Sequence, residues 1–301
     1  MKRRSSVTGR CRHSRFSKWN AAVVLISILL VPLRLAWADS DAIEGQLKSD
    51  YVGKVLTLRH FYGGEHLRFH ADGTLKGNAS IGPWTLDAHI VGKEFLLRDG
   101  VLIIKGRRIY WIFDSSSKPQ VLTTIENNRQ KPKKDIEKTL RSPMVEIEIE
   151  LPGGTPDQKD VSSAMHNVFF TESDSMSDVV PSYWHAYFAK QEGKPETAPR
   201  LEEPVYRANP GAGVSAPQAT YQPGPEYSPE ARQLRYEGIA ILSIIVDVSG
   251  RPQGIQIQRP LGLGLDEKAV AAVSTWKFEP AQKDGKPVAV VISIEIQFHL
   301  Y

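Results

Sequence analysis

The sequence predicts an α+β protein with two folded parts. They are a mainly β domain with one or two helices over residues 40–190 and a C-terminal module of three antiparallel strands and two helices over residues 225–301. Three observations lead to this prediction. Short runs of β-forming residues, separated by glycine turns, fill residues 54–125. Eight prolines fall within residues 191–229, which favours an extended linker, placed at 191–224. Beyond the linker, continuous aliphatic runs typical of strands alternate with stretches whose apolar residues have helical spacing.

The charge of the chain is concentrated at its start. Residues 1–38 hold eight of the 38 lysines and arginines and no acidic residue. The remaining chain therefore has 30 basic against 34 acidic residues, a net charge of −4, although the whole chain carries +4. Because the basic excess belongs to this leader, we expect no nucleic-acid partner.

The leader has the three parts of a secretory signal. A basic stretch precedes an apolar run from Ala21 to Leu33, and Ala36 and Ala38 supply the small residues of a cleavage site. The apolar run is 13 residues long, shorter than the roughly 20 that span a bilayer. Export with cleavage after Ala38 is the prediction, and a retained membrane anchor over residues 20–38 is the alternative. Cys11 is the only cysteine, so no disulfide is expected after cleavage.

The mainly β domain is predicted to be a compact antiparallel barrel or sandwich. A helix-compatible stretch over residues 40–51 precedes it, and Asp72-Gly73 favours a hairpin. The expected strands are short and close together. They are Val55–Tyr62, His66–His70, Trp84–Ile90, Glu94–Leu97, Val101–Lys105 and Ile109–Phe113.

Two further elements are expected before the linker. Residues 145–151 alternate apolar and acidic residues, as in a half-exposed strand. Its glutamates, Glu146, Glu148 and Glu150, form either a solvated face or a set of carboxylates presented to a partner. Thr155 is expected to cap a helix that follows, with Pro156 in its first turn.

The C-terminal module is predicted to run helix, strand, strand, helix, strand. Ser228 can cap a first helix over Pro229–Tyr236, which Gly238 terminates. Two strands then flank the turn at residues 247–250, and a helix with one apolar face covers residues 265–276.

The last strand has the clearest pattern of the chain. From Val288 to Leu300, every second residue is apolar, and Val291, Ser293, Glu295 and Gln297 fall on the opposite face. Such alternation fixes which face of a strand is buried. We therefore expect the even-numbered residues to face the core.

A set of motifs in this module resembles the TonB C-terminal domain family. The resemblance covers about 75 of the 301 residues. It is carried by motifs in the family's order and spacing. These are Pro225-x-Tyr227-Ser228-Pro229-x-Ala231-Arg232, Gly238, Val246-Asp247-Val248-Ser249-Gly250-Arg251, Leu265-Asp266-x-x-Ala269, Trp276-x-Phe278-x-Pro280-Ala281 and Gly285-Lys286-Pro287-Val288.

The resemblance implies a periplasmic protein that binds partners. In that family the domain pairs a sheet edge with the TonB box of an outer-membrane receptor, and ExbB/ExbD-type inner-membrane proteins couple transport to the proton gradient. A strand added to an open edge is held by backbone hydrogen bonds. The strand from Val288 to Phe298 is then the expected docking edge, with Val291, Ser293, Glu295 and Gln297 selecting the partner. A homodimer is left open.

The chain also departs from that family. Ser228 separates Tyr227 from the proline that usually follows it, and Pro252 stands where an aliphatic residue usually begins the second strand. A cleavable-looking leader and a folded β domain replace the usual membrane helix and long spacer. A soluble periplasmic adaptor that binds partners without energy transduction is therefore the alternative function.

The sequence gives no sign of an enzyme or of a cofactor. It holds no G-x-S-x-G, P-loop or H-E-x-x-H motif. His60, His66 and His70 lie close together in sequence, but nothing nearby fixes a third ligand. Ordinary surface or core histidines are expected rather than a metal site.

Overall fold

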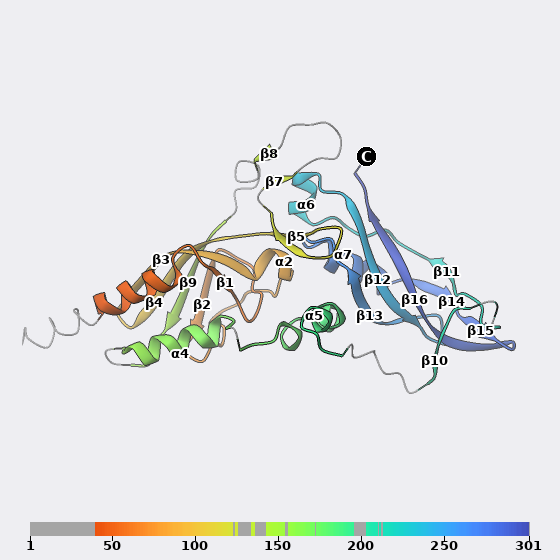
Figure 1. Ribbon diagram of the computed structural model, residues 1–301, viewed down its shortest axis with the longest axis horizontal. Coiled ribbons are helices and arrows are strands. Elements are labelled where there is room, and N and C mark those ends of the chain that lie inside the picture. Colours follow the sequence, from red (N-terminus) through yellow and green to blue (C-terminus); the bar gives the residue numbers. More distant parts are fainter. Residues whose placement is uncertain are drawn as a thin grey trace, which may run out of the picture.

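The structure is a computed structural model (Figure 1) that describes residues 40–300, except for 123, 126–133, 136–142, 154–155, 172, 196–202, 210 and 212. The predicted leader, with Ala36 and Ala38, lies outside the described residues. Within the described part of the chain, no helix is both long enough and apolar enough to cross a membrane. The fold is α+β, as predicted.

The N-terminal part is built on one open sheet of five strands, in the order β1-β3-β4-β9-β2. The strands are β1 (Val55–Thr57), β2 (His66–His70), β3 (His89–Arg98), β4 (Val101–Arg108) and β9 (Met144–Glu150). All neighbours are antiparallel except β2 and β9, which are parallel. A helix over residues 40–51 and α4 (Gln158–Val168) share a hydrophobic cluster with the buried face of this sheet.

The expected antiparallel barrel or sandwich is therefore wrong. The sheet stays open because its end strands β1 and β2 do not pair with each other, and because the helix over residues 40–51 and α4, rather than a second sheet, cover its apolar face, on which β9 buries Val145, Ile147 and Ile149. On the other face its glutamates lie opposite basic residues of β2, and Arg68 Nε is 3.4 Å from Glu148. The glutamates thus form part of a partly exposed ionic ladder.

Two local expectations for this part are also corrected. The stretch from Trp84 begins as the short helix α2 (Trp84–Asp87), with β3 starting at His89. Pro83, in an extended conformation, precedes this helix. Helix α4 begins later than expected, because Asp157 is its N-cap and forms a capping box with Asp160. Thr155 lies outside the described residues.

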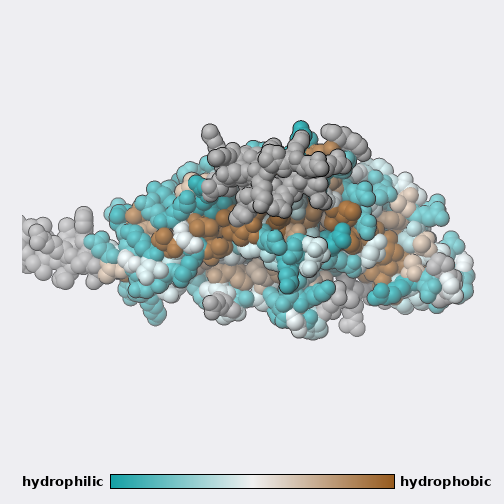
Figure 2. All heavy atoms as spheres, turned by 45° about the horizontal axis from the view of Figure 1, so that its top comes forward, coloured by the Kyte–Doolittle hydropathy of each residue, from teal (hydrophilic) through white to brown (hydrophobic). Residues whose placement is uncertain are grey.

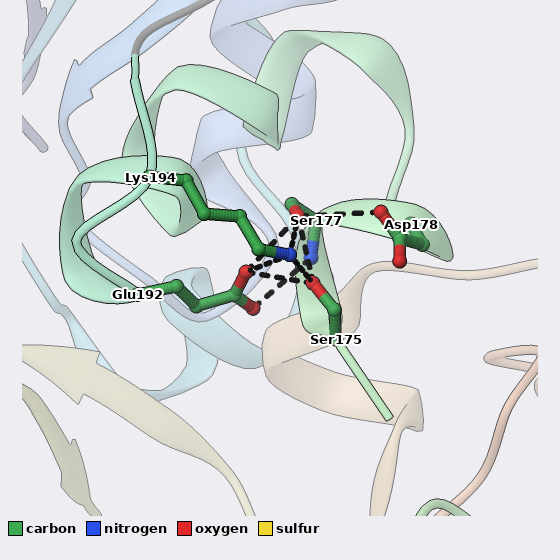
Figure 3. A network of polar contacts seen from close by, with 5 residues as sticks. All are labelled: Ser175, Ser177, Asp178, Glu192 and Lys194. Carbon is green, nitrogen blue, oxygen red and sulfur yellow. Dashed lines mark hydrogen bonds and ion pairs between the residues drawn. The ribbon is translucent and has the colours of Figure 1, made fainter. Parts of the chain in front are cut away.

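A run of small elements leads from this sheet toward the linker. They are β5 (Trp111–Phe113), β6 (Pro119–Val121), β7 (Thr124–Ile125), β8 (Lys134–Asp135), η1 (Met176–Asp178), η2 (Ser182–Trp184) and α5 (His185–Gln191). A polar network joins η1 to the end of α5 (Figure 3): Glu192 accepts hydrogen bonds from Ser175 and Ser177, and Lys194 lies 2.9 Å from its carboxylate. Partial burial opposes ionisation, but these contacts outweigh it and lower the pKa of Glu192 to about 2.

The C-terminal module contains a five-stranded sheet rather than the three strands expected. β10 (Val205–Arg207), β16 (Lys286–Phe298), β12 (Gly238–Val246) and β13 (Pro252–Arg259) follow in that order, and β15 (Ala281–Lys283) also pairs with β16. The three expected strands are β12, β13 and β16. The two additional strands are short. β10 lies in the predicted linker, where the many prolines argued against a strand.

The helices of the module pack on its buried face. Ser228 caps α6 (Pro229–Leu234) by accepting a hydrogen bond from the Ala231 amide at 3.1 Å. This helix ends at Leu234, two residues before the expected Tyr236, because Arg235 adopts the left-handed conformation with φ of 51°. Helix α7 (Leu265–Val273) contributes Leu265, Ala269 and Val273 to the core. A two-stranded sheet of β11 (Gln218–Tyr221) and β14 (Lys277–Glu279) lies beside them.

The five-stranded sheet of the N-terminal part has a hydrophobic cluster of its own, but other elements of that part share a second cluster with the C-terminal module. Trp84 and Trp184 belong to the same buried cluster as Leu242 and Leu263, and Trp111 packs against it. In the space-filling view, hydrophobic residues run as a band along the molecule across both parts (Figure 2). Helix α5 and η2 pack against β13. The linker thus connects two parts that are in direct contact.

Polar contacts fix the same junction. The Gly264 amide donates to Thr85 Oγ1 at 2.9 Å, the Leu263 amide to the Trp111 carbonyl at 3.1 Å, and Trp184 Nε1 to Glu267 Oε1 at 3.0 Å. Each of these bonds joins residues more than 80 positions apart in the sequence. The arrangement of the two parts is therefore set by specific contacts and not by the linker alone.

Candidate docking edge

Strand β16 has an open edge segment on which a partner strand can be added. On one side it pairs with β12 along its whole second part, from Val246↔Val290 to Gly238↔Phe298. β15 pairs with residues 286–288 and β10 with residues 289–291. No strand in the described part of the chain pairs with Ile292–Phe298 on the side away from β12. Figure 1 shows β10 and β15 at one end of β16 and the chain terminus beyond the other.

The faces of β16 follow the predicted alternation. Val290, Ile296 and Phe298 are buried, whereas Ser293, Glu295 and Gln297 are exposed. Val291, the fourth residue predicted to select a partner, is half-buried because it lies opposite Arg207 of β10. Ala289 is buried although it belongs to the outer set. Three of the four predicted residues thus lie along the open segment, and the fourth lies where β10 ends.

A groove lies on the outer face of the sheet beside this segment. It has a volume of about 670 Å³ and is lined by residues from four strands. Hydroxyl and amide side chains dominate its polar lining: Ser243 on β12, Gln256 and Gln258 on β13, and Ser293 on β16. Arg207 of β10 is the one charged residue among the described residues that line it. Sequence reasoning missed this residue, because β10 was assigned to the linker.

Two buried carboxyl groups support the sheet from the junction side. Asp266 accepts hydrogen bonds from the Leu261 amide at 2.8 Å and the Gly262 amide at 2.7 Å. These bonds hold the chain between β13 and α7 in place. Burial, with a smaller contribution from the charge of neighbouring Glu267, raises the pKa of Asp266 to about 8. Burial also raises the pKa of Glu267.

This raised pKa predicts a pH-dependent stability. Below the ordinary pKa of 3.8, Asp266 is protonated in both the folded and the unfolded chain. Above that pH the unfolded chain is ionised while the folded chain keeps the proton until the pH approaches 8, so the stability associated with Asp266 is progressively lost over this interval. We expect the free energy of unfolding of the wild type to fall between pH 5 and pH 8 relative to Asp266→Asn, which stays neutral. Urea unfolding across that range measures it, and parallel curves for the two proteins would contradict it.

The other side chains singled out from the sequence lie far from this edge. His66 and His70 stand on the charged face of β2, with Nδ1 atoms 3.9 Å from Glu146 and 3.3 Å from Glu150. His60 packs beside the ring of Tyr62 at 5.8 Å between centroids. The three histidines thus make separate contacts.

An α+β module with an open strand edge is an arrangement that can accept an extended segment by strand addition. Residues 223–300 match the family described as Gram-negative bacterial TonB protein C-terminal. This part of the chain is therefore a TonB C-terminal domain, as the sequence motifs predicted.

Two curated relatives agree with this assignment. Protein tonB2 of Pseudomonas aeruginosa is 38% identical over 81 residues, which is 27% of this chain and 30% of that protein. Protein TonB of Vibrio cholerae serotype O1 is 38% identical over 77 residues, 25% of this chain and 32% of that protein. The match thus spans about a third of each relative. The solution NMR structure of the Pseudomonas aeruginosa TonB CTD is 22% identical with a TM-score of 0.22, covering 30% of this chain and 91% of that one.

Proposed function

We propose that this chain is a periplasmic TonB-like protein that binds outer-membrane TonB-dependent receptors through β16 and supports energy-coupled transport. The observation that carries the proposal is the open segment Ile292–Phe298, whose outer side chains Ser293, Glu295 and Gln297 are exposed. A receptor segment that pairs there gains a row of backbone hydrogen bonds, so affinity does not depend on one side chain. ExbB/ExbD-type proteins are the inner-membrane partners that this role requires.

Disulfide trapping tests strand addition at this edge. We expect single cysteines at Ser293, Glu295 or Gln297 to form disulfides with cysteines placed in a peptide that copies the periplasmic N-terminal segment of a receptor from the same organism. Directly opposite residues of paired strands have Cβ atoms about 4.5–5.5 Å apart, close enough for this bond after small adjustments. Trapping should step by two residues as the peptide cysteine moves by two.

Gln253→Cys is the matched control, because Gln253 is exposed on β13, away from the proposed edge. Cys11 is replaced by serine throughout, since it is the only natural cysteine. Equal trapping at Gln253 and at the β16 positions would reject β16 as the docking edge.

One observation favours a second candidate, a soluble periplasmic adaptor. Residues that precede the TonB C-terminal domain fold into a sheet and pack on that domain through Trp84, Trp111 and Trp184. A compact part of this kind provides much less reach across the periplasm than an extended spacer, which covers about 3.3–3.6 Å per residue. The trapping experiment in cells separates the two candidates. Collapse of the proton gradient should change the trapping pattern of a transducer and leave that of an adaptor unchanged.

A further inference from the structure

The position of β10 defines what a strand added to β16 would meet. β10 runs parallel to β16 on the side away from β12. Val205 lies opposite Ala289, Tyr206 opposite Val290 and Arg207 opposite Val291. Tyr206 is held from the other face by Lys283, whose Nζ lies 4.5 Å from the centre of the tyrosine ring. An added strand on the open segment would therefore continue the line of β10. Its first outward position beyond Arg207 lies opposite Ser293.

The distance between these two positions suits a direct contact. Residues on opposing strands share a face with the residue they oppose, so Arg207 and a partner residue opposite Ser293 would both point to the outer face. They would be separated by two residues along one line, roughly 6.6 Å at the usual rise per residue. An arginine side chain can cover that distance. Arg207 is exposed, which leaves its guanidinium group accessible.

The groove at this point offers hydrogen-bond donors. The side-chain oxygen Oε1 of Gln258 accepts a hydrogen bond from Ser293 Oγ at 3.1 Å, and Oε1 of Gln256 accepts one from the Ala186 backbone amide at 3.2 Å. These bonds orient both side chains and leave their amide nitrogens as donors. Together with Arg207, they form a set of donors with one positive charge, which complements a carboxylate.

A negative charge is disfavoured one step further along the strand. The next outward residue of β16 is Glu295, which is exposed on the same face as Ser293. A partner carboxylate opposite Glu295 would meet a like charge, and directly opposed like charges weaken strand pairing. The edge thus distinguishes the position beside Arg207 from its neighbour.

We propose that Arg207, although it lies outside the TonB C-terminal domain at residues 223–300, determines specificity for an acidic side chain in the partner segment, at the position opposite Ser293. This inference rests on the proposed strand addition to β16. It assigns to the predicted linker a part in recognition, because β10 brings Arg207 to the end of the docking edge. The partner class is an extended peptide that carries one aspartate or glutamate at this position.

The test uses the full chain and three capped heptapeptides that alternate valine and threonine. They differ only at the central position, which is glutamate, glutamine or lysine. We expect the glutamate peptide to bind about tenfold more tightly than the glutamine peptide in fluorescence anisotropy at low salt, as for a charge-assisted hydrogen bond. Arg207→Gln should remove this preference, and Arg207→Glu should transfer it to the lysine peptide.

Arg235→Gln is the matched control, since it removes the same charge from an exposed residue at the end of α6. It should keep the full preference for glutamate. Equal binding of all three peptides to the wild type, or a glutamate preference that survives in Arg207→Gln, would overturn the role of Arg207 and leave strand addition standing. Failure of every peptide to bind the wild type would instead reject strand addition, and this inference with it.

Discussion

Replacing Trp184 with alanine should lower the free energy of unfolding by about 3–5 kcal/mol. The side chain is fully buried, and it packs against Trp84, Phe113 and Phe188 at centroid distances of 5.8, 6.0 and 5.8 Å. Truncation leaves a large cavity at the junction between the N-terminal part and the TonB C-terminal domain. It also removes the donor to Glu267, whose second carboxylate oxygen has no hydrogen-bond partner among the described residues. Urea unfolding at a fixed pH measures the loss.

Trp184→Phe separates the two contributions. Phenylalanine keeps much of the aromatic contact and cannot donate to Glu267, so the smaller loss expected for this variant reports mainly the hydrogen bond. A loss below about 1 kcal/mol for Trp184→Ala would show that the side chain is not part of a shared core.

Trp184→Ala also tests whether the two parts unfold together. Because residues of both parts meet in one buried cluster, we expect a single unfolding transition in the wild type. The junction is weakened in Trp184→Ala, so the two parts of this variant should unfold in separate transitions. This coupling matters for the proposed function, because force that a bound partner applied to β16 would act on a domain that is packed against the N-terminal part.

The second large effect is expected for Gly250→Ala, at the turn between β12 and β13. Gly250 has φ of 76°, and an added Cβ atom would lie 1.9 Å from the carbonyl oxygen of Phe278. The turn would therefore have to move away from β14. This movement would weaken the hydrogen bond that the Phe278 amide donates to the Gly250 carbonyl at 2.9 Å. We expect a loss of about 2–4 kcal/mol in the free energy of unfolding, from backbone strain together with the displaced contact.

Gly285→Ala is the control that isolates the strain. Gly285 has the same φ of 76°, in the turn between β15 and β16, and nothing lies within 4 Å of an added Cβ atom. This variant should lose only the cost of a left-handed alanine, about 1 kcal/mol. Equal losses at the two glycines would mean that the contact with Phe278 contributes nothing.

The docking edge shows how far local pattern reaches. The alternation along β16 correctly assigned Val290, Ile296 and Phe298 to the core and Ser293, Glu295 and Gln297 to the outside. That prediction holds because a one-residue slip would expose the whole apolar set. The pattern could not show that Val291 is half-buried, since the residue that covers it belongs to β10, more than 80 positions earlier.

The errors in the N-terminal part have a similar origin. Short β-forming runs were correctly placed for β2 and β4, but the same runs are compatible with a barrel, a sandwich or an open sheet. The choice depended on the parallel pairing of β2 with β9, far apart in sequence, and on the two helices that cover the apolar face in place of a second sheet. Trp84 looked like the start of a strand because aromatic residues favour strands, and its burial against Trp184 and Phe188 overrides that preference.

The sequence by itself determined the α+β class, the motifs of the TonB C-terminal domain and the register of its last strand. Each of these depends on residues near one another in the chain, where periodicity and turn chemistry act directly. Only the tertiary structure decided that the two parts share a core, that β10 ends beside the open segment of β16, and that Arg207 faces the groove. These features arise from contacts between distant short segments, whose own sequences are too brief to specify a partner.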